Sequence, residues 1–145
     1  MTILIKSNLK KQRPPAARIR ASLRMLMGSA GLRDAEVSVL LTGDRAMRTL
    51  NRRYRGKDRT TDVLSFPLRG GTFSRVQRRL LGDIVICLPV AARQARAAGE
   101  TLLDEIDRLL VHGFLHLLGY DHEQSGREAR RMEERERRLR EALKR

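Results

Sequence analysis

Hydrophobic positions along the chain predict strands and helices that follow one another without strict alternation. Residues 2–6 and 36–42 have the apolar spacing and the length of β-strands, and we expect the first to lie at a sheet edge. Residues 62–66 predict a third strand. Residues 82–88 predict a fourth, apolar enough to be buried on both of its faces. The pattern therefore predicts a sheet of about four strands.

About five helices are predicted from apolar residues at helical spacing and from residues that favour helix ends. Their starts are marked by Pro14-Pro15, Gly43-Asp44, Pro89, Thr101 and a Ser125/Glu128 capping box. In the last helix, which runs to about Leu143, the predicted core stripe consists of Ala129, Met132, Leu139 and Leu143. We expect its many Arg and Glu residues to form a solvated, ion-paired face. These elements predict an α+β fold, a small mixed sheet packed with helices, in a single domain over residues 1–145.

The net charge of the protein indicates what kind of molecule it binds. The 145 residues include 31 Lys and Arg against 17 Asp and Glu, a net charge of +14. Nucleotide bias could explain the preference for Arg over Lys, but it does not explain the shortage of acids. Between Arg45 and Arg59, seven basic residues stand against one acid, Asp58. Such an imbalance favours binding to nucleic acid, with an acidic protein or a membrane surface as alternatives.

Other features of the composition favour a cytoplasmic protein. No apolar run approaches the 18 or so residues of a membrane-spanning helix, and the first ten residues lack the features of a secretory signal. Cys87 is the only cysteine and has apolar neighbours, so we expect a buried thiol without a disulfide. We therefore expect no membrane association.

All three histidines, His112, His116 and His122, fall within one short segment and predict a metal site. Residues four apart share one face of a helix, so His112 and His116 can bind the same ion. Gly119 would end that helix and allow the chain to bring His122 back as a third ligand. Three imidazoles suit one Zn²⁺ ion and leave a fourth coordination position open, as in catalytic zinc sites. The competing interpretation is a coincidental group of core and surface histidines.

The spacing His-x3-His-x2-Gly-x2-His also matches the ligand frame of metzincin proteases, so we expect a metzincin-like zinc-binding helix. Metzincins carry a glutamate directly after the first histidine, where it is the general base for peptide hydrolysis. Here that position is Gly113. The sequence therefore predicts the metal frame without the protease chemistry.

Three blocks of the chain together resemble the YbeY family of bacterial endoribonucleases. They are the segment from His112 to His122, the segment Leu81-Gly82-Asp83-Ile84-Val85-Ile86, and the stretch from Leu50 through Asp58 that continues from Thr61 to Pro67. Thr60 departs from the family, which commonly has proline there. The resemblance implies a metal-dependent endoribonuclease, specific for single strands, that acts in small-subunit ribosomal RNA maturation and ribosome quality control. It also implies contacts with the small ribosomal subunit, a ribosomal protein and a ribosome-assembly GTPase.

Roles for individual residues follow from this resemblance and from the local sequence. Arg55 matches the functional arginine of the family and would hold the scissile phosphate. We expect Asp121 to orient a histidine from the second coordination shell. Tyr54 shares helical spacing with Leu50, which predicts core packing rather than base stacking. The residues predicted to contact the RNA backbone are Arg52, Arg53 and Lys57.

Two other functions compete with this hypothesis. The first is an RNA- or ribosome-binding assembly factor in which zinc is only structural. The second is a zinc hydrolase of peptides or small molecules, which Gly113 and the positive charge both disfavour. Neither Glu105 nor Asp107 can be assigned as general base from sequence.

Overall fold

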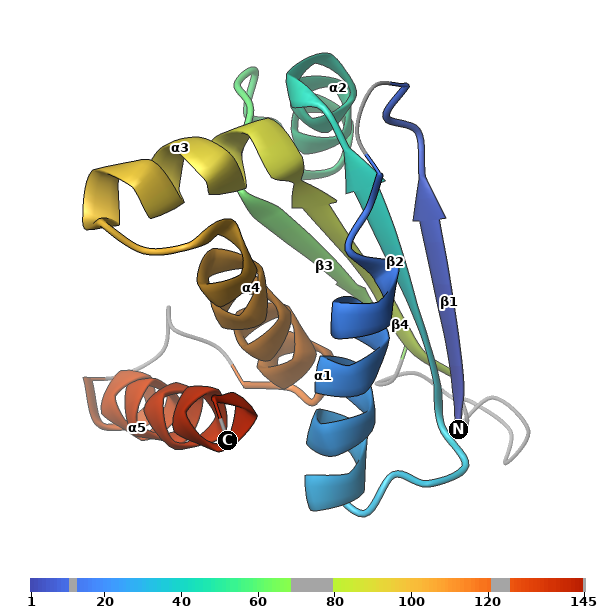
Figure 1. The fold of residues 1–145 in the computed structure, drawn as a ribbon, viewed down its shortest axis with the longest axis vertical. Helices are drawn as coiled ribbons and strands as arrows, with labels where there is room; N and C mark the ends of the chain where they lie inside the picture. Colours follow the sequence, from blue (N-terminus) through green and yellow to red (C-terminus); the bar gives the residue numbers. More distant parts are fainter. Residues whose placement is uncertain (11–12, 69–79, 121–125, 145) are drawn as a thin grey trace.

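A computed structural model describes residues 1–10, 13–68, 80–120 and 126–144. In these ranges, four strands form one sheet and five helices pack around it (Figure 1), which confirms the predicted α+β fold. The elements in chain order are β1 (Thr2–Ser7), α1 (Ala16–Ser29), β2 (Glu36–Thr42), α2 (Asp44–Arg55), β3 (Val63–Pro67), β4 (Leu80–Cys87), α3 (Leu88–Ala98), α4 (Leu102–Leu117) and α5 (Gly126–Leu143).

The sheet is mixed, with strand order β1-β2-β4-β3. β1 pairs in parallel with β2, and β2 in parallel with β4, whereas β3 runs antiparallel to β4 from Val63 opposite Ile86 to Pro67 opposite Gly82. β1 is therefore an edge strand, as predicted. The central strand β4 is buried along most of its length because helices cover parts of both sheet faces.

The main core lies between one face of the sheet and the helices α1 and α4. Alternate residues of the strands point into it, as the two-residue period of a strand requires. They include Val37, Val39 and Leu41 of β2 and Ile84 and Ile86 of β4. α1 adds the apolar positions predicted from its helical spacing, namely Ile19, Leu23, Leu26 and Met27.

A second, smaller core on the opposite sheet face holds α2 in place. Met47 of α2 packs there with Leu64, Val85 and Cys87. Cys87 is fully buried and unpaired, as predicted, and burial raises the pKa of its thiol. Because the thiolate is the reactive form, this cysteine is a structural residue.

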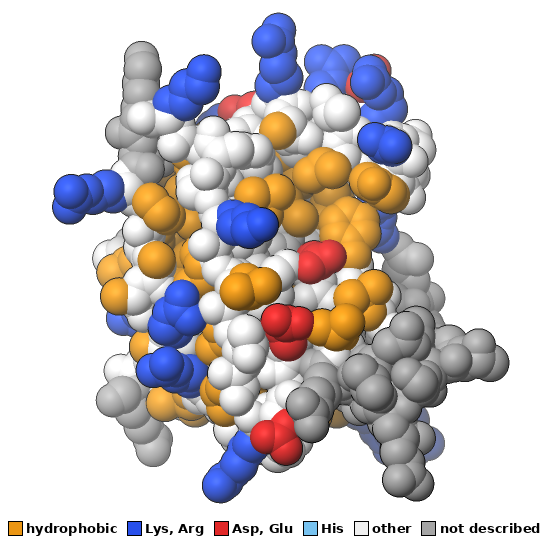
Figure 2. All heavy atoms as spheres, turned by 90° about the vertical axis from the view of Figure 1, so that its right-hand side faces the viewer, with side chains coloured by type: hydrophobic (Ala, Val, Ile, Leu, Met, Phe, Trp, Pro, Cys, Tyr) orange, Lys and Arg blue, Asp and Glu red, His pale blue; other side chains and the backbone are white. Residues whose placement is uncertain are grey.

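The remainder of that sheet face is open to solvent. Figure 2 shows hydrophobic side chains among Lys and Arg on the side of the molecule turned away from α4 and α5; Leu4 is 46% exposed. No helix in the described part of the chain combines the length and hydrophobicity that crossing a membrane would need.

α4 occupies the centre of the fold, in contact with α1, α3, α5, β3 and β4. It begins where the sequence predicts, because the side chain of Thr101 accepts a hydrogen bond from the backbone N–H of Asp104 at 3.1 Å. The buried carboxylate of Asp107 then ties it to α1, accepting hydrogen bonds from Ser22 Oγ at 2.7 Å and from Arg18 at 2.6 Å. These contacts leave little freedom in how α4 lies on the sheet. The predicted Ser125 cap of α5 lies outside the described residues.

Candidate metal centre and active site

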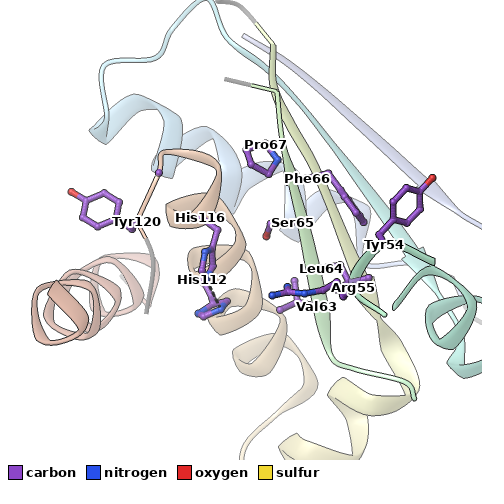
Figure 3. A pocket seen from close by; sticks show the side chains of 11 residues that line it. Tyr54, Arg55, Val63, Leu64, Ser65, Phe66, Pro67, His112, His116 and Tyr120 are labelled. Carbon is purple, nitrogen blue, oxygen red and sulfur yellow. Dashed lines mark hydrogen bonds between the residues drawn. The ribbon is translucent and has the colours of Figure 1, made fainter. Parts of the chain in front are cut away.

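A cavity of about 650 Å³ lies between α4 and β3, next to the end of α2. Figure 3 shows His112 and His116 on the α4 side and Ser65 and Arg55 facing them. The cavity is lined by Tyr54, Arg55, Val63, Leu64, Ser65, Phe66, Pro67, His112, His116, Gly119 and Tyr120. Two of the three sequence blocks that carry the family resemblance line this cavity, and the third lies in β4, the neighbour of β3 in the sheet.

His112 and His116 face each other as the four-residue spacing predicts. Their ring centroids are 4.5 Å apart, and the two Nε2 atoms are separated by 3.1 Å. Two imidazole nitrogens that bind one tetrahedral zinc at about 2.0–2.1 Å lie about 3.3 Å from each other. The observed separation is therefore close to what a shared ion requires.

The other ring nitrogen of His112 is also engaged. Its Nδ1 lies 2.7 Å from Oε1 of Glu136, which comes from α5. In metal sites, the second ring nitrogen of a histidine ligand commonly donates a hydrogen bond to a carboxylate, which orients the ring. Glu136 is not predicted from the sequence, because the charged residues of this helix have the pattern of a solvated face.

The other predicted residues of this site are His122 and Asp121, which lie outside the described residues. Among the residues that the structure describes, no group of three His, Cys, Asp or Glu side chains is placed to hold a metal ion. Within the described residues, His112 and His116 supply two nitrogen donors for an ion.

Arg55 reaches the cavity because it is the last residue of α2. Gly56 follows in the left-handed conformation, with φ of 70°, and its N–H donates to the carbonyl of Arg52 at 3.1 Å. The chain after the helix is fixed by Asn51, whose side chain donates to the carbonyl of Arg59 at 2.8 Å. Figure 3 shows the guanidinium of Arg55 pointing towards His112.

The residues predicted to contact RNA do not line the cavity. Arg52, Arg53 and Lys57 are all exposed, on α2 and just beyond it. Arg52 lies 3.9 Å from the carboxylate of Asp58, which pairs more closely with Arg48, at 2.9 Å. These cations form a basic surface beside the cavity rather than part of its wall.

The prediction that Tyr54 packs in the core was wrong. Tyr54 is 57% exposed at the rim of the cavity, in an edge-to-face contact with Phe66 at 5.2 Å between ring centroids. The guanidinium of Arg53 lies 5.7 Å from the Tyr54 ring. Helical spacing with Leu50 was misleading because α2 covers only one end of the sheet, so its last turn extends past the small core.

The two acids left unassigned from sequence are structural. Glu105 is buried and accepts hydrogen bonds from Gln94, at 2.7 Å, and from Arg108. Asp107 binds α1 as described above. Neither lines the histidine cavity, so neither is placed to move a proton there.

Gly113 is a close-packing position. A Cβ atom at this residue would lie 3.0 Å from Cγ2 of Ile84 and 3.2 Å from Oγ of Ser65. The absence of a side chain lets α4 approach β3 and β4, and the larger glutamate found in metzincins has no room here.

We expect Gly113→Ala to lower the free energy of unfolding by about 1 kcal/mol. Overpacking against Ile84 should cost about 2 kcal/mol, and the better helix propensity of alanine offsets about 1 kcal/mol of that cost. Urea unfolding followed by circular dichroism measures the change. In an Ile84→Ala background, which removes the crowded methyl groups, the same substitution should become stabilising. Gly28→Ala, where a Cβ meets open space in α1, is the control and should not destabilise. Equal destabilisation in both backgrounds would refute the packing argument.

Comparison with known proteins identifies the family of this chain. Residues 6–144 match the family model described as endoribonuclease YbeY. A curated endoribonuclease YbeY of Geobacter sulfurreducens is 42% identical over 140 residues, covering 96% of this chain and 93% of that protein. One from Anaeromyxobacter sp. (strain Fw109-5) is 48% identical over 136 residues, covering 94% of this chain and 69% of that protein.

A solved structure extends the comparison to the fold. A protein of Thermotoga maritima, known from its solution structure, aligns with a TM-score of 0.68 and 28% identity, over 98% of this chain and 89% of that one. The family match covers nearly the whole chain, including α2, β3, β4, α4 and α5, which together form and support the histidine cavity. This chain belongs to the endoribonuclease YbeY family.

Proposed function

We propose that the histidine cavity carries out zinc-dependent cleavage of single-stranded ribosomal RNA during maturation of the small ribosomal subunit and in ribosome quality control. Family membership makes the chain an endoribonuclease. The observation that supports the site is the placement of the two facing Nε2 atoms, 3.1 Å apart, and Arg55 around the same cavity. A nuclease needs such a combination, since it must bind a phosphodiester and stabilise its developing charge.

His112 and His116, with His122 as the proposed third ligand, would hold the Zn²⁺ ion. Three neutral imidazoles suit this ion and leave a coordination position open. The ion, when bound, would supply Lewis acidity towards a phosphate oxygen or an attacking hydroxyl. The proposed role of Asp121 is to orient one of the histidine ligands.

Arg55 is proposed to bind the scissile phosphate. Its planar guanidinium can donate two parallel hydrogen bonds to phosphate oxygens and neutralise the charge that develops during cleavage. Its position at a helix end, fixed by Gly56 and by the Asn51 hydrogen bond, places its backbone beside the cavity.

The dimensions of the site favour an unpaired strand. A cavity of about 650 Å³ lies in the range that holds a small ligand, so it suits one nucleotide with its phosphate rather than a duplex. The flanking backbone would then cross the basic surface of Arg52, Arg53 and Lys57. We further propose that the protein acts in the cytoplasm with the small ribosomal subunit, a ribosomal protein and a ribosome-assembly GTPase.

The first test separates catalysis from metal binding. His116→Ala should lose bound zinc and cleavage of a single-stranded ribosomal RNA fragment, because one of its proposed ligands is removed. Arg55→Ala should keep zinc but slow cleavage about 10²-fold or more, the loss typical when a donor to a developing charge is removed. Zinc content and single-turnover rates are the two readouts.

Arg45→Ala is the matched control, since Arg45 is an exposed arginine of the same helix that does not line the cavity. It should leave both readouts unchanged. If Arg55→Ala cleaved RNA as fast as the unmodified protein, the proposed role of Arg55 would be wrong. If the unmodified protein bound zinc and RNA but cut nothing even with ribosomal subunits present, the assembly-factor hypothesis would replace catalysis.

A second prediction concerns the basic surface. Replacing Arg52, Arg53 and Lys57 by alanine should weaken binding of single-stranded RNA at every sequence and make it less dependent on salt. The slope of log K against log salt is negative, and each lost phosphate contact reduces its magnitude by about 0.7. The salt titration is read by fluorescence anisotropy with the zinc-loaded protein. Arg24→Ala, on the exposed side of α1, should leave the slope unchanged; an unchanged slope in the triple variant would contradict the assignment of this surface.

A further inference from the structure

We infer that Glu136 of α5 is a positioning residue of the metal centre, which holds His112 in the tautomer that presents the lone pair of Nε2 to the ion. This inference rests on the proposed function, since it concerns the same site. It adds to the site a residue of α5, which lies outside the histidine motif in the sequence.

Glu136 is unusual among the charged residues of its helix. Met132 and Leu139 pack against the main core, and Glu136 lies between them at helical spacing, on the same face of α5. Its side chain is 14% exposed, whereas the side chains of Glu134 and Glu141 are 55% and 61% exposed and pair with arginines of their own helix. A carboxylate in an apolar stripe is costly unless it is paired, so this position calls for a specific partner.

That partner is the histidine. Glu136 Oε1 lies 2.7 Å from His112 Nδ1, across the interface between α5 and α4. A neutral imidazole carries its proton on only one of the two nitrogens. A carboxylate accepts but cannot donate, so it holds that proton on Nδ1.

The consequence appears on the opposite edge of the ring. With the proton on Nδ1, the lone pair of His112 is on Nε2, the atom that faces Nε2 of His116 at 3.1 Å. In addition, the contact fixes the rotation of the ring.

The same geometry excludes two other roles for Glu136. It cannot bind an ion shared by His112 and His116, because it contacts the nitrogen on the other side of the ring. For the same reason it is not placed to take a proton from a group bound in the cavity, and it does not line the cavity wall. Glu136 thus acts through His112 rather than on the substrate.

The experiment compares Glu136→Ala and Glu136→Gln with the unmodified full-length protein. Zinc affinity is measured by competition with a chromophoric chelator. Removing an outer-shell partner of this kind weakens metal binding by roughly 10- to 100-fold, and we expect that loss for the alanine variant. The glutamine variant keeps the shape and a hydrogen-bond acceptor but loses the charge, so its loss should be smaller. Glu133→Gln, an exposed glutamate of the same helix, removes the same charge and should bind zinc like the unmodified protein.

Nitrogen NMR of the imidazole rings supplies a readout that a merely structural role would not change. In the unmodified, zinc-free protein at a pH where imidazole is neutral, the His112 ring should be protonated on Nδ1. In Glu136→Ala it should shift towards protonation on Nε2, while amide spectra show α5 still folded. If the amide spectra show that Glu136→Ala disturbs α5, the zinc affinity of Glu136→Gln tests the positioning role of Glu136 instead.

The outcomes separate this inference from the proposed function. Unchanged zinc affinity and an unchanged His112 tautomer in both variants would overturn the role of Glu136, even if the unmodified protein cleaves RNA. Failure of the unmodified protein to bind zinc would overturn the metal centre itself, and the positioning role with it. Weaker zinc binding together with the tautomer shift would establish Glu136 as part of the centre.

Discussion

The close approach of α4 to the sheet at Gly113 is the contact on which the site depends. Ile84 and Ser65 already occupy the space that a side chain would need, so the helix rests almost directly on β3 and β4. This contact sets the width of the hollow whose opposite walls carry the histidines and Arg55. The hydrogen bonds of Asp107 to Arg18 and Ser22 hold the same helix from its other side. Histidine placement is therefore a consequence of how one helix packs.

The rest of the centre is assembled around α4 from distant parts of the sequence. α2 ends at Arg55 because Gly56 adopts the left-handed conformation, and the small core around Met47 fixes where that end lies. On the other side, α5 packs through Met132 and brings Glu136 to His112. A cationic surface at the end of α2 adjoins the cavity without lining it. The residues proposed to attract phosphate and those proposed to bind the metal thus lie on separate elements.

Much of this arrangement could be predicted from sequence, because it depends on local patterns. Strand β2 begins and ends where its apolar residues predict, Thr101 caps α4, and the spacing of His112 and His116 places their nitrogens face to face. Long-range packing could not be predicted in the same way. Tyr54 has core spacing, but it lies exposed at the rim of the cavity, where its ring meets Phe66 of β3 edge to face. Glu136 looks like one of many charges on α5, and only the burial of Met132 and Leu139 beside it shows which face it occupies. That pair of flanking apolar residues is the sequence signal that could have identified it.

The most direct test of the proposed metal centre is a crystal structure of the zinc-loaded protein with anomalous scattering recorded at the zinc edge. If the proposed metal centre is right, one strong anomalous peak per chain will lie within bonding distance of Nε2 of both His112 and His116, with a third ligand from the segment 121–125. Glu136 should remain on Nδ1 of His112, and Arg55 should face the ion across the cavity. A peak elsewhere, or an ion bound through Glu136 instead of the two Nε2 atoms, would show that His112 and His116 do not form the metal centre.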